Sequence, residues 1–469
     1  MKKIKELLLL GAILCSVQIF GQQTQSLNLR EIVSHALDYN KTIASKRLDI
    51  EKNELTQKQI RAVFIPTIEA SGTYGFTQGS FVVDSNPLDI AYPGLQIPSI
   101  IPGLPGISLP PGSINVPGVD DVLDFQSQAY LAGVTAKWTL FTGFKATNLI
   151  KATNHKNEAE KQLLNQQEKD FIIEIANYVD QLSVVNKVLD LLEFQQQRLD
   201  TESKAASKAL EQGLITRSEA QKIVLAQLQL DSKKTEFSGN KAVLSRKLQQ
   251  LTGIPMQDFL YSTTELVPIT KVNTEASYLD RPELKALEEA QTAKDYQIKS
   301  ENAGYLPKVQ AFATTQYAGF SNGNIADLSY NNLSVTPLNA VGIGAKWELF
   351  DGMHTKHKKD QLKIEKQQLE LKKQDTEELL SLNYDNALSQ FNTANTKLIA
   401  DKKGAEIAKE QFEIAVKEYH AGLIGTRDLL ETQSDLITMQ TTYYKSLSQQ
   451  RISALKLMNA GNNLTLENL

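Results

Sequence analysis

The chain has 469 residues, of which 22% are charged, with a formal net charge of −4 and a single cysteine, Cys15. This slightly acidic balance argues against a nucleic-acid partner, and one cysteine cannot form an internal disulfide or a cysteine metal site. A globular chain of this length would be expected to form about three domains. Long stretches rich in Gln, Lys, Glu, Leu and Ala instead favour extended helices, so we expect one elongated, mainly α fold with a small β part.

Residues 1–21 have the features of an export signal. Three lysines precede an apolar run from Leu7 to Phe20, and Gly21 precedes a polar stretch. The run is too short to span a bilayer comfortably, so a signal peptide cleaved near Gly21 is favoured over a membrane anchor or a buried helix. Leu14 stands before Cys15, where lipid modification would need a small residue, and we therefore expect no lipid anchor.

The rest of the chain is an internal duplication. "AKWTLFTG" at 136–143 returns as "AKWELFDG" at 345–352, and "EQGLIT" at 211–216 returns as "HAGLIG" at 420–425, both 209 residues later. Upstream, "FIPTIEA" at 64–70 returns as "YLPKVQA" at 305–311, 241 residues later, so the first repeat holds 32 extra residues. Self-similarity of this kind predicts two structurally similar halves.

The expected organisation follows from these offsets. After the signal peptide we expect a first repeat at 22–253, a linker or equatorial segment at 254–280, and a second repeat at 281–469. The first repeat would hold a β-hairpin at about 66–141 and a helical hairpin at about 143–253; the second, a β-hairpin at about 307–350 and a helical hairpin at about 352–461. A segment at about 84–124 holds eight of the fourteen prolines, which excludes a helix or a central strand. We expect it to be an extracellular loop over a barrel mouth.

Each long helix carries apolar residues at heptad spacing. In the first repeat they run from Phe171 to Leu210, and adding 209 gives a matching series from Leu380 to Tyr419. This spacing predicts long helices that pair side by side. Each helix is expected to end at Gly213 or Gly422 in a tight hairpin. Shorter helical segments should flank the long ones, at about 30–62, 216–253, 281–303 and 426–460.

Four segments alternate with period two, and both tryptophans lie near the end of a second strand, at Trp138 and Trp347. On the alternation alone, a half-buried soluble hairpin is the better reading. Tryptophan at matching strand ends favours a membrane barrel with an aromatic belt. Four strands cannot close a membrane barrel, because the smallest have about eight, so the barrel must be shared among protomers.

The whole layout resembles the TolC family of outer-membrane efflux proteins. The resemblance rests on "W.LF.G" after each hairpin, "YNKTI" and "DRPEL" at the shorter helices, an aromatic-x-Pro before the first strand, the "GL" tips at 213 and 422, and "L..L.G" at 248–253. It implies a homotrimer with a shared 12-stranded transmembrane β-barrel in the outer-membrane lipid, and a coiled-coil α-barrel across the periplasm. It also implies a periplasmic membrane-fusion adaptor and an inner-membrane pump of the RND or ABC type as partners.

The resemblance also suggests roles for particular residues. The hairpin tips would contact the adaptor. Alternatively, their apolar residues form only a hydrophobic staple. Asp428 and Glu431, with Tyr419, would form a pore constriction, although Asp428 would also suit a helix N-terminus. The family's Arg after the turn glycine is replaced by Ile424. The tip residues are Gly213, Leu214, Ile215, Gly422, Leu423 and Ile424, and the expected membrane-interface anchors are Trp138, Phe141, Trp347 and Phe350.

The sequence holds no catalytic set, and we expect neither an enzyme nor a cofactor. His354 and His357 stand three apart on a helix, but "HTKHKK" is more typical of a solvated basic face than of a metal pair. The predicted function is a passive exit duct for small molecules in a tripartite efflux pump. The alternatives are the exit duct of a type I protein secretion system and a periplasmic coiled-coil scaffold without a channel.

Overall fold

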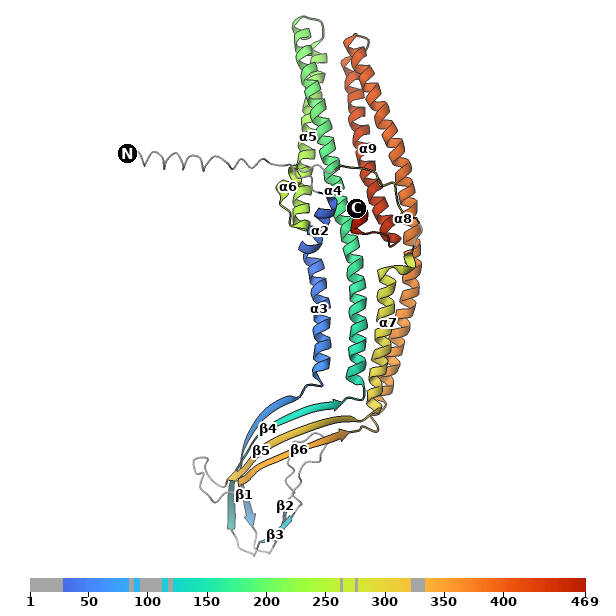
Figure 1. Ribbon diagram of the computed structural model, residues 1–469. Coiled ribbons are helices and arrows are strands. Elements are labelled where there is room, and N and C mark those ends of the chain that lie inside the picture. The colour runs from blue at the N-terminus through green and yellow to red at the C-terminus, as the bar shows by residue number, and fades with distance from the viewer. Residues whose placement is uncertain are drawn as a thin grey trace, which may run out of the picture. The chain divides into compact units, whose positions relative to one another are not determined.

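The computed structural model describes residues 28–83, 88–92, 112–116, 121–261, 265–274, 277–321 and 334–469. The expected signal peptide and most of the Pro-rich segment lie outside these residues. The chain divides into two compact units. The tip unit comprises Met1–Leu48, Gln162–Lys285 and Gln374–Leu469, and the sheet unit comprises Asp49–Lys161 and Ala286–Lys373. Figure 1 shows the elements of both.

The two long helices begin and end at matching positions of the two repeats. Helix α4 spans Lys145–Glu211 and α8 spans His354–His420, each of 67 residues, so both ends shift by 209. Their return helices are α5 at Arg217–Thr252 and α9 at Thr426–Ala460. The other helices are α2 at Leu29–Tyr39, α3 at Lys41–Ala62, α6 at Met256–Tyr261 and α7 at Pro282–Glu301, with 3-10 turns at Tyr278–Asp280, Asn302–Tyr305 and Leu466–Asn468. The mainly helical fold is thus as predicted.

The segment expected to be helical at about 30–62 forms two helices. It divides at Asn40, within the "YNKTI" motif, into α2 and α3. The Asn40 side chain accepts hydrogen bonds from the backbone N–H groups of Thr42 and Ile43 at 2.8 and 3.0 Å. An asparagine that caps a new helix in this way satisfies N–H groups that would otherwise have no partner, which explains the break.

The core of the tip unit follows the predicted heptads. Most of the first series is buried, including Phe171, Ile175, Leu192 and Leu199, while Leu210 near the tip is exposed. The members of the second series that are buried are Leu380, Tyr384, Ala387, Phe391, Ala394, Ala408 and Ala415. A second set of α4 side chains, among them Ala176, Val179 and Val188, is also buried, so α4 packs on more than one neighbour.

The sheet unit contains an antiparallel sheet in the order β1-β4-β5-β6 (Figure 1), with free edges at β1 and β6. Its strands are β1 at Thr67–Val83, β4 at Asp121–Phe141, β5 at Lys308–Ser321 and β6 at Ser334–Lys346. Strand β4 therefore begins inside the segment expected to be loop. A separate pair, β2 at Leu88–Tyr92 and β3 at Gly112–Val116, also falls within that segment.

The strand registers repeat the duplication. Thr67 pairs with Lys137 in the first hairpin, and Lys308 pairs with Lys346 in the second. Adding 241 to the number of Thr67 gives Lys308, and adding 209 to that of Lys137 gives Lys346. The two hairpins therefore have the same register as far as Gln316, beyond which β5 and β6 shift register, because register follows the alternation of the two faces.

Helix α7 is fixed along the beginning of α8 by charged pairs within the sheet unit. The pairs are Lys294 with Glu365 at 2.6 Å, Lys366 with Asp295 at 2.8 Å and Lys373 with Glu288 at 2.9 Å. His155 of α4 meets Glu289 of α7 at 2.6 Å and stacks on Tyr296.

Candidate channel wall and helical tips

The polar face of the sheet is buried on the middle strands β4 and β5, whereas the apolar face is exposed. Thr135 and Thr314 face each other across β4 and β5, are 8% and 7% exposed, and join their hydroxyl groups at 2.8 Å. On the other face, Val341 is 85% and Ile343 72% exposed. The further exposed side chains of this apolar face are Ile68, Tyr74, Phe76, Tyr130, Val134, Trp138, Leu140 and Tyr317. A soluble sheet shows the reverse, whereas a membrane barrel places apolar residues toward lipid and polar residues toward its lumen.

Phe312 is an apolar side chain on the polar face of the sheet, directly opposite Lys137 of β4. It is buried there and pairs with Gly342. A Cβ atom on Gly342 would lie only 2.8 Å from the Phe312 ring. The glycine therefore makes room for the ring on the inner face.

The two tryptophans make the same contact in both repeats. Trp138 Nε1 donates a hydrogen bond to the backbone oxygen of Phe64 at 2.9 Å. Trp347 Nε1 donates to the backbone oxygen of Tyr305 at 3.3 Å. Both rings remain exposed. An exposed ring with a satisfied N–H suits the boundary between lipid and water. Trp347 lies one residue beyond the end of β6.

The two phenylalanines proposed as anchors differ. Phe350 is exposed. Phe141 is only partly exposed, and its ring meets that of Phe144 edge to face, with 5.0 Å between centroids. Phe141 therefore packs against the residue that precedes α4.

The helical tips share one backbone geometry. Gly213 and Gly422 have φ values of 72° and 73°, in the left-handed region that favours glycine. The next residues close the turns: Leu214 N–H donates to Ala209 oxygen at 2.8 Å, and Leu423 N–H donates to Glu418 oxygen at 2.9 Å. This arrangement satisfies the last carbonyl groups of each long helix.

The six proposed adaptor-contact residues separate into exposed and packed members. Leu214 is 72% and Leu423 75% exposed. Ile215 and Ile424 are partly buried against the cores of the first and second hairpins. The leucines and the turn glycines beside them are thus exposed, while the isoleucines anchor the turns.

The tips of the two repeats differ in charge. Asp428 and Glu431 are exposed on α9, three residues apart and so on one face. Asp435, which the sequence analysis missed, is also exposed one turn further on. The equivalent residues of the first repeat are Glu219 and Lys222, which pair at 2.6 Å. The same two positions are therefore neutral as a pair in one repeat and doubly acidic in the other.

Tyr419, the third proposed constriction residue, is partly buried, and Asp428 also makes the contact expected of a residue at a helix start. Tyr419 packs against the core around Phe412 and Leu429. Asp428 Oδ2 accepts a hydrogen bond from the N–H of Gly425 at 3.3 Å, so this carboxylate also stabilises the start of α9. At the same tip, His420 Nε2 lies 3.3 Å from Glu202 Oε1 of α4.

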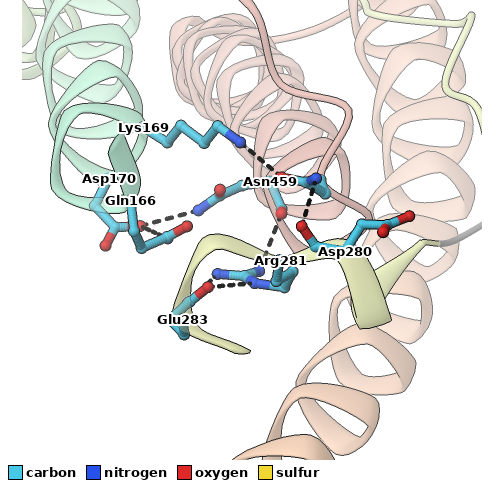
Figure 2. Close-up of polar contacts among 8 residues, drawn as sticks. Gln166, Lys169, Asp170, Asp280, Arg281, Glu283 and Asn459 are labelled. Carbon is cyan, nitrogen blue, oxygen red and sulfur yellow. Dashed lines mark hydrogen bonds and ion pairs between the residues drawn. The ribbon is translucent and has the colours of Figure 1, made fainter. Parts of the chain in front are cut away.

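A buried polar network surrounds Arg281, the arginine of "DRPEL" (Figure 2). Arg281 is 3% exposed and donates two hydrogen bonds to Glu283, at 2.5 and 3.1 Å, and one to the backbone oxygen of Asn459 at 3.0 Å. Asn459 in turn donates to Asp170 of α4 at 2.9 Å. Burial raises the pKa of the Asp170 carboxyl and lowers that of Lys169 beside it. The motif thus joins α7, α9 and α4, a role that the sequence analysis did not assign.

A buried ion pair joins α4 to α9. Arg451 Nε donates to Asp180 Oδ2 at 2.8 Å, and Arg451 also donates to the backbone oxygen of Val267 at 2.6 Å. The Asp180 side chain is 1% exposed. Burial raises the pKa of Asp180 to about 6, although the Arg451 guanidinium acts to lower it.

Neither a metal centre nor a spanning helix is found in the described part of the chain. No three or more His, Cys, Asp or Glu side chains gather there in a way that could hold a metal ion. No described helix is both long enough and apolar enough to cross a membrane.

The fold is that of known outer-membrane channels. The outer-membrane channel CmeC of Campylobacter jejuni matches with a TM-score of 0.68 at 14% identity over 94% of this chain and 87% of that one. The channel OprN matches with a TM-score of 0.66 at 12% identity over 93% and 90%. VceC of Vibrio cholerae matches with a TM-score of 0.63 at 13% identity over 92% and 95%. No curated protein matches the chain in sequence.

A family model matches most of the second repeat. Residues 276–463 match the model described as outer membrane efflux protein. This match, together with the fold shared with known channels along nearly the whole chain, supports an outer-membrane efflux duct. Neither the matched family nor these channels are enzymes.

Proposed function

We propose that three copies of this chain close a 12-stranded barrel in the outer membrane and form the exit duct of a tripartite pump for small molecules. The observation that carries the proposal is the four-stranded sheet, whose apolar face is exposed, whose polar face is buried on its middle strands, and whose edge strands β1 and β6 each pair on one side only among the described residues. Free edges are not tolerated in lipid, so β6 of one protomer must pair with β1 of the next. Three protomers of four strands give twelve.

The duplication supplies the register of this pairing. Within one chain, β4 pairs with β5, and Ala136 lies opposite Ala313. Shifting Ala136 by 209 gives Ala345 of β6, and shifting Ala313 back by 241 gives Gly72 of β1. Because both hairpins already obey these offsets, we expect Gly72 of one protomer to lie opposite Ala345 of its neighbour.

The tips are the proposed contact with a periplasmic adaptor. Two leucines at tight turns, Leu214 and Leu423, are exposed in the same geometry. Exposed apolar residues at repeated positions are typical of protein interaction sites. An inner-membrane pump would then deliver its cargo through the adaptor into the duct.

The constriction is proposed at Asp428 and Glu431. In a trimer the second-repeat tips would bring three copies of this acidic pair toward one axis, while the first-repeat tips carry the Glu219–Lys222 pair. Only the second-repeat tips would therefore present net negative charge to the pore.

The proposal is tested on the protein extracted from outer membranes in mild detergent. We expect a trimer by native mass spectrometry and ion-conducting channels after insertion into planar bilayers. Recovery of the protein as a soluble periplasmic monomer, or a complete lack of conductance, would instead favour a coiled-coil scaffold.

A further inference from the structure

The inner face of the sheet carries an unneutralised pair of lysines. Lys308 and Lys346 lie directly opposite each other on β5 and β6. Like charges at directly opposed positions destabilise a sheet. Neither lysine has an ion-pair partner among the described residues. Glu348, the nearest carboxylate in sequence, lies beyond the end of β6 and pairs with neither in the described structure.

The first repeat serves as an internal comparison. Its equivalent positions hold Thr67 and Lys137, and Lys137 donates to Glu69 at 2.8 Å. The residue equivalent to Glu69 in the second repeat is Gln310. The same three positions are thus neutral in the first repeat and carry two positive charges in the second. A structural need for lysines here would apply to both hairpins, so the difference points to a ligand.

A cavity adjoins Lys308. Its volume is about 490 Å³, within the range of small-molecule sites. Lys308 and Lys145 both line it, and none of the described residues that line it is acidic. Thr139 and Gln310, whose side chains meet at 3.5 Å, share the inner face with Lys308. The remaining lining residues come from α3, the end of β4 and the start of α4: Thr56, Gln59, Ile60, Val63, Phe141, Thr142, Ala146 and Leu149.

The lining combines two chemical characters. Ile60, Val63 and Leu149 offer an apolar wall, and the two lysines offer cationic hydrogen-bond donors. We propose that this cavity binds anions with an apolar body, whose carboxylate or sulfonate pairs with Lys308 and Lys145 while Lys346 adds positive charge. This inference rests on the proposed function, because the cavity would then lie on the inner wall of the duct and its ligands would be cargo.

The test uses two fluorescent probes that differ by one acid group, 8-anilino-1-naphthalenesulfonate and the neutral N-phenyl-1-naphthylamine. The wild-type protein is reconstituted in nanodiscs of zwitterionic phosphatidylcholine, and the signal of empty nanodiscs is subtracted. Gln310→Glu places the carboxylate of the first repeat beside Lys308. We expect it to weaken sulfonate binding about tenfold, the size of one charge-assisted hydrogen bond, and to leave binding of the neutral probe unchanged.

Further variants guard against misfolding and nonspecific effects. Lys145→Gln with Lys308→Gln should weaken sulfonate binding at least as much, and Lys308→Arg should retain it. Glu69→Gln with Lys137→Gln, which changes the equivalent positions of the first repeat without altering net charge, should leave it unchanged.

Two results would overturn the site. In one, sulfonate binding stays at the wild-type level in both weakening variants. In the other, both probes lose affinity in parallel, which would leave only an apolar groove. All lining residues come from one chain, so the assay reads the cavity whether or not a trimer forms. If the protein forms conducting trimers but its sulfonate binding does not depend on these lysines, the site is refuted and the proposed duct function still stands.

Discussion

The indole N–H of Trp138 donates a hydrogen bond to the backbone oxygen of Phe64 at 2.9 Å, joining the end of β4 to the residue that precedes β1 by three positions. Trp347 and Tyr305 repeat the contact in the other hairpin at 3.3 Å. Each tryptophan thereby ties the two ends of its hairpin together where the strands meet the helices. The recurring "AKW" motif is thus the signature of a joint in each hairpin.

Removing both indole hydrogen bonds should weaken this joint. Trp138→Phe with Trp347→Phe keeps an aromatic ring at the boundary and removes the donor. We expect a loss of about 1 kcal/mol at each site, seen as a lower temperature of trimer dissociation on gels. Tyr317→Phe, which removes a polar atom from the same apolar face, is the matched control. Equal dissociation temperatures for the double variant and wild type would show that the hydrogen bonds contribute nothing.

Charged tips should abolish efflux without affecting assembly. Leu214→Asp with Leu423→Asp places charge where an apolar partner surface is proposed, at side chains that are largely exposed. We expect loss of dye efflux in a strain that depends on this protein, with normal trimer and membrane levels. Gln212→Asp adds charge to the same tip but keeps both leucines, and should leave efflux intact. Full efflux by the leucine variant would show that the tips are not the adaptor site.

The acidic pair on α9 should make the closed pore prefer cations. Two carboxylates about 7 Å apart repel by roughly 0.6 to 2 kcal/mol for an effective dielectric of about 80 to 20. In planar bilayers, Asp428→Asn with Glu431→Gln should lower cation selectivity and weaken block by multivalent cations added from the periplasmic side. Asparagine keeps an acceptor for the Gly425 N–H. Glu219→Gln with Lys222→Gln is the first-repeat control. Identical currents in wild type and the acidic-pair variant would show that Asp428 and Glu431 are only helix-start carboxylates.

The sequence predicted features that depend on spacing. The heptads place Ile175 and Leu192 in the core, and the 209-residue offset matches both ends of α4 and α8. The "YNKTI" motif indicated a shorter helix in this region, and the hydrogen bonds from Thr42 and Ile43 to the Asn40 side chain identify the residue at which α3 begins.

The site was less predictable, because its contacts cross between segments far apart in sequence. Nothing in "DRPEL" indicates that Arg281 bonds to the end of α9. The opposition of Lys308 and Lys346 appears only when the strand register is known. Ile215 and Ile424 resemble their neighbouring leucines in sequence, and only packing separates the anchored residues from the exposed ones.

The buried Asp180 should make stability depend on pH. Its pKa of about 6 lies above the ordinary aspartate pKa of 3.8, so between these values the folded protein binds more protons than the unfolded chain. Its contribution is then greatest below pH 4, falls as the pH rises to about 6, and is constant above. The fall is about 3 kcal/mol per protomer.

This pH dependence is measured by thermal denaturation between pH 4 and 7. Asp180→Asn, which mimics the protonated carboxyl, should lack the decline seen in wild type over that range and should therefore be no less stable than wild type near neutral pH. Asp385→Asn, at an exposed position of α8, should keep the wild-type slope. A wild-type slope in Asp180→Asn would assign the effect to other groups.

The shared barrel is tested most directly by a disulfide between protomers. The only cysteine, Cys15, lies in the expected signal peptide, so Gly72→Cys with Ala345→Cys introduces a single pair, and Gly72 has open space for a side chain. Directly opposed side chains lie within about 4.5 to 5.5 Å at Cβ, close enough for a disulfide after small adjustment. Mild oxidation in native outer membranes should give covalent trimers on a denaturing gel that revert to monomers with reductant. Ser71→Cys with Ala345→Cys, whose side chains would point to opposite faces, should remain largely monomeric. Monomers only from the first pair, or equal cross-linking of both pairs, would contradict a barrel closed by β6 and β1 in this register.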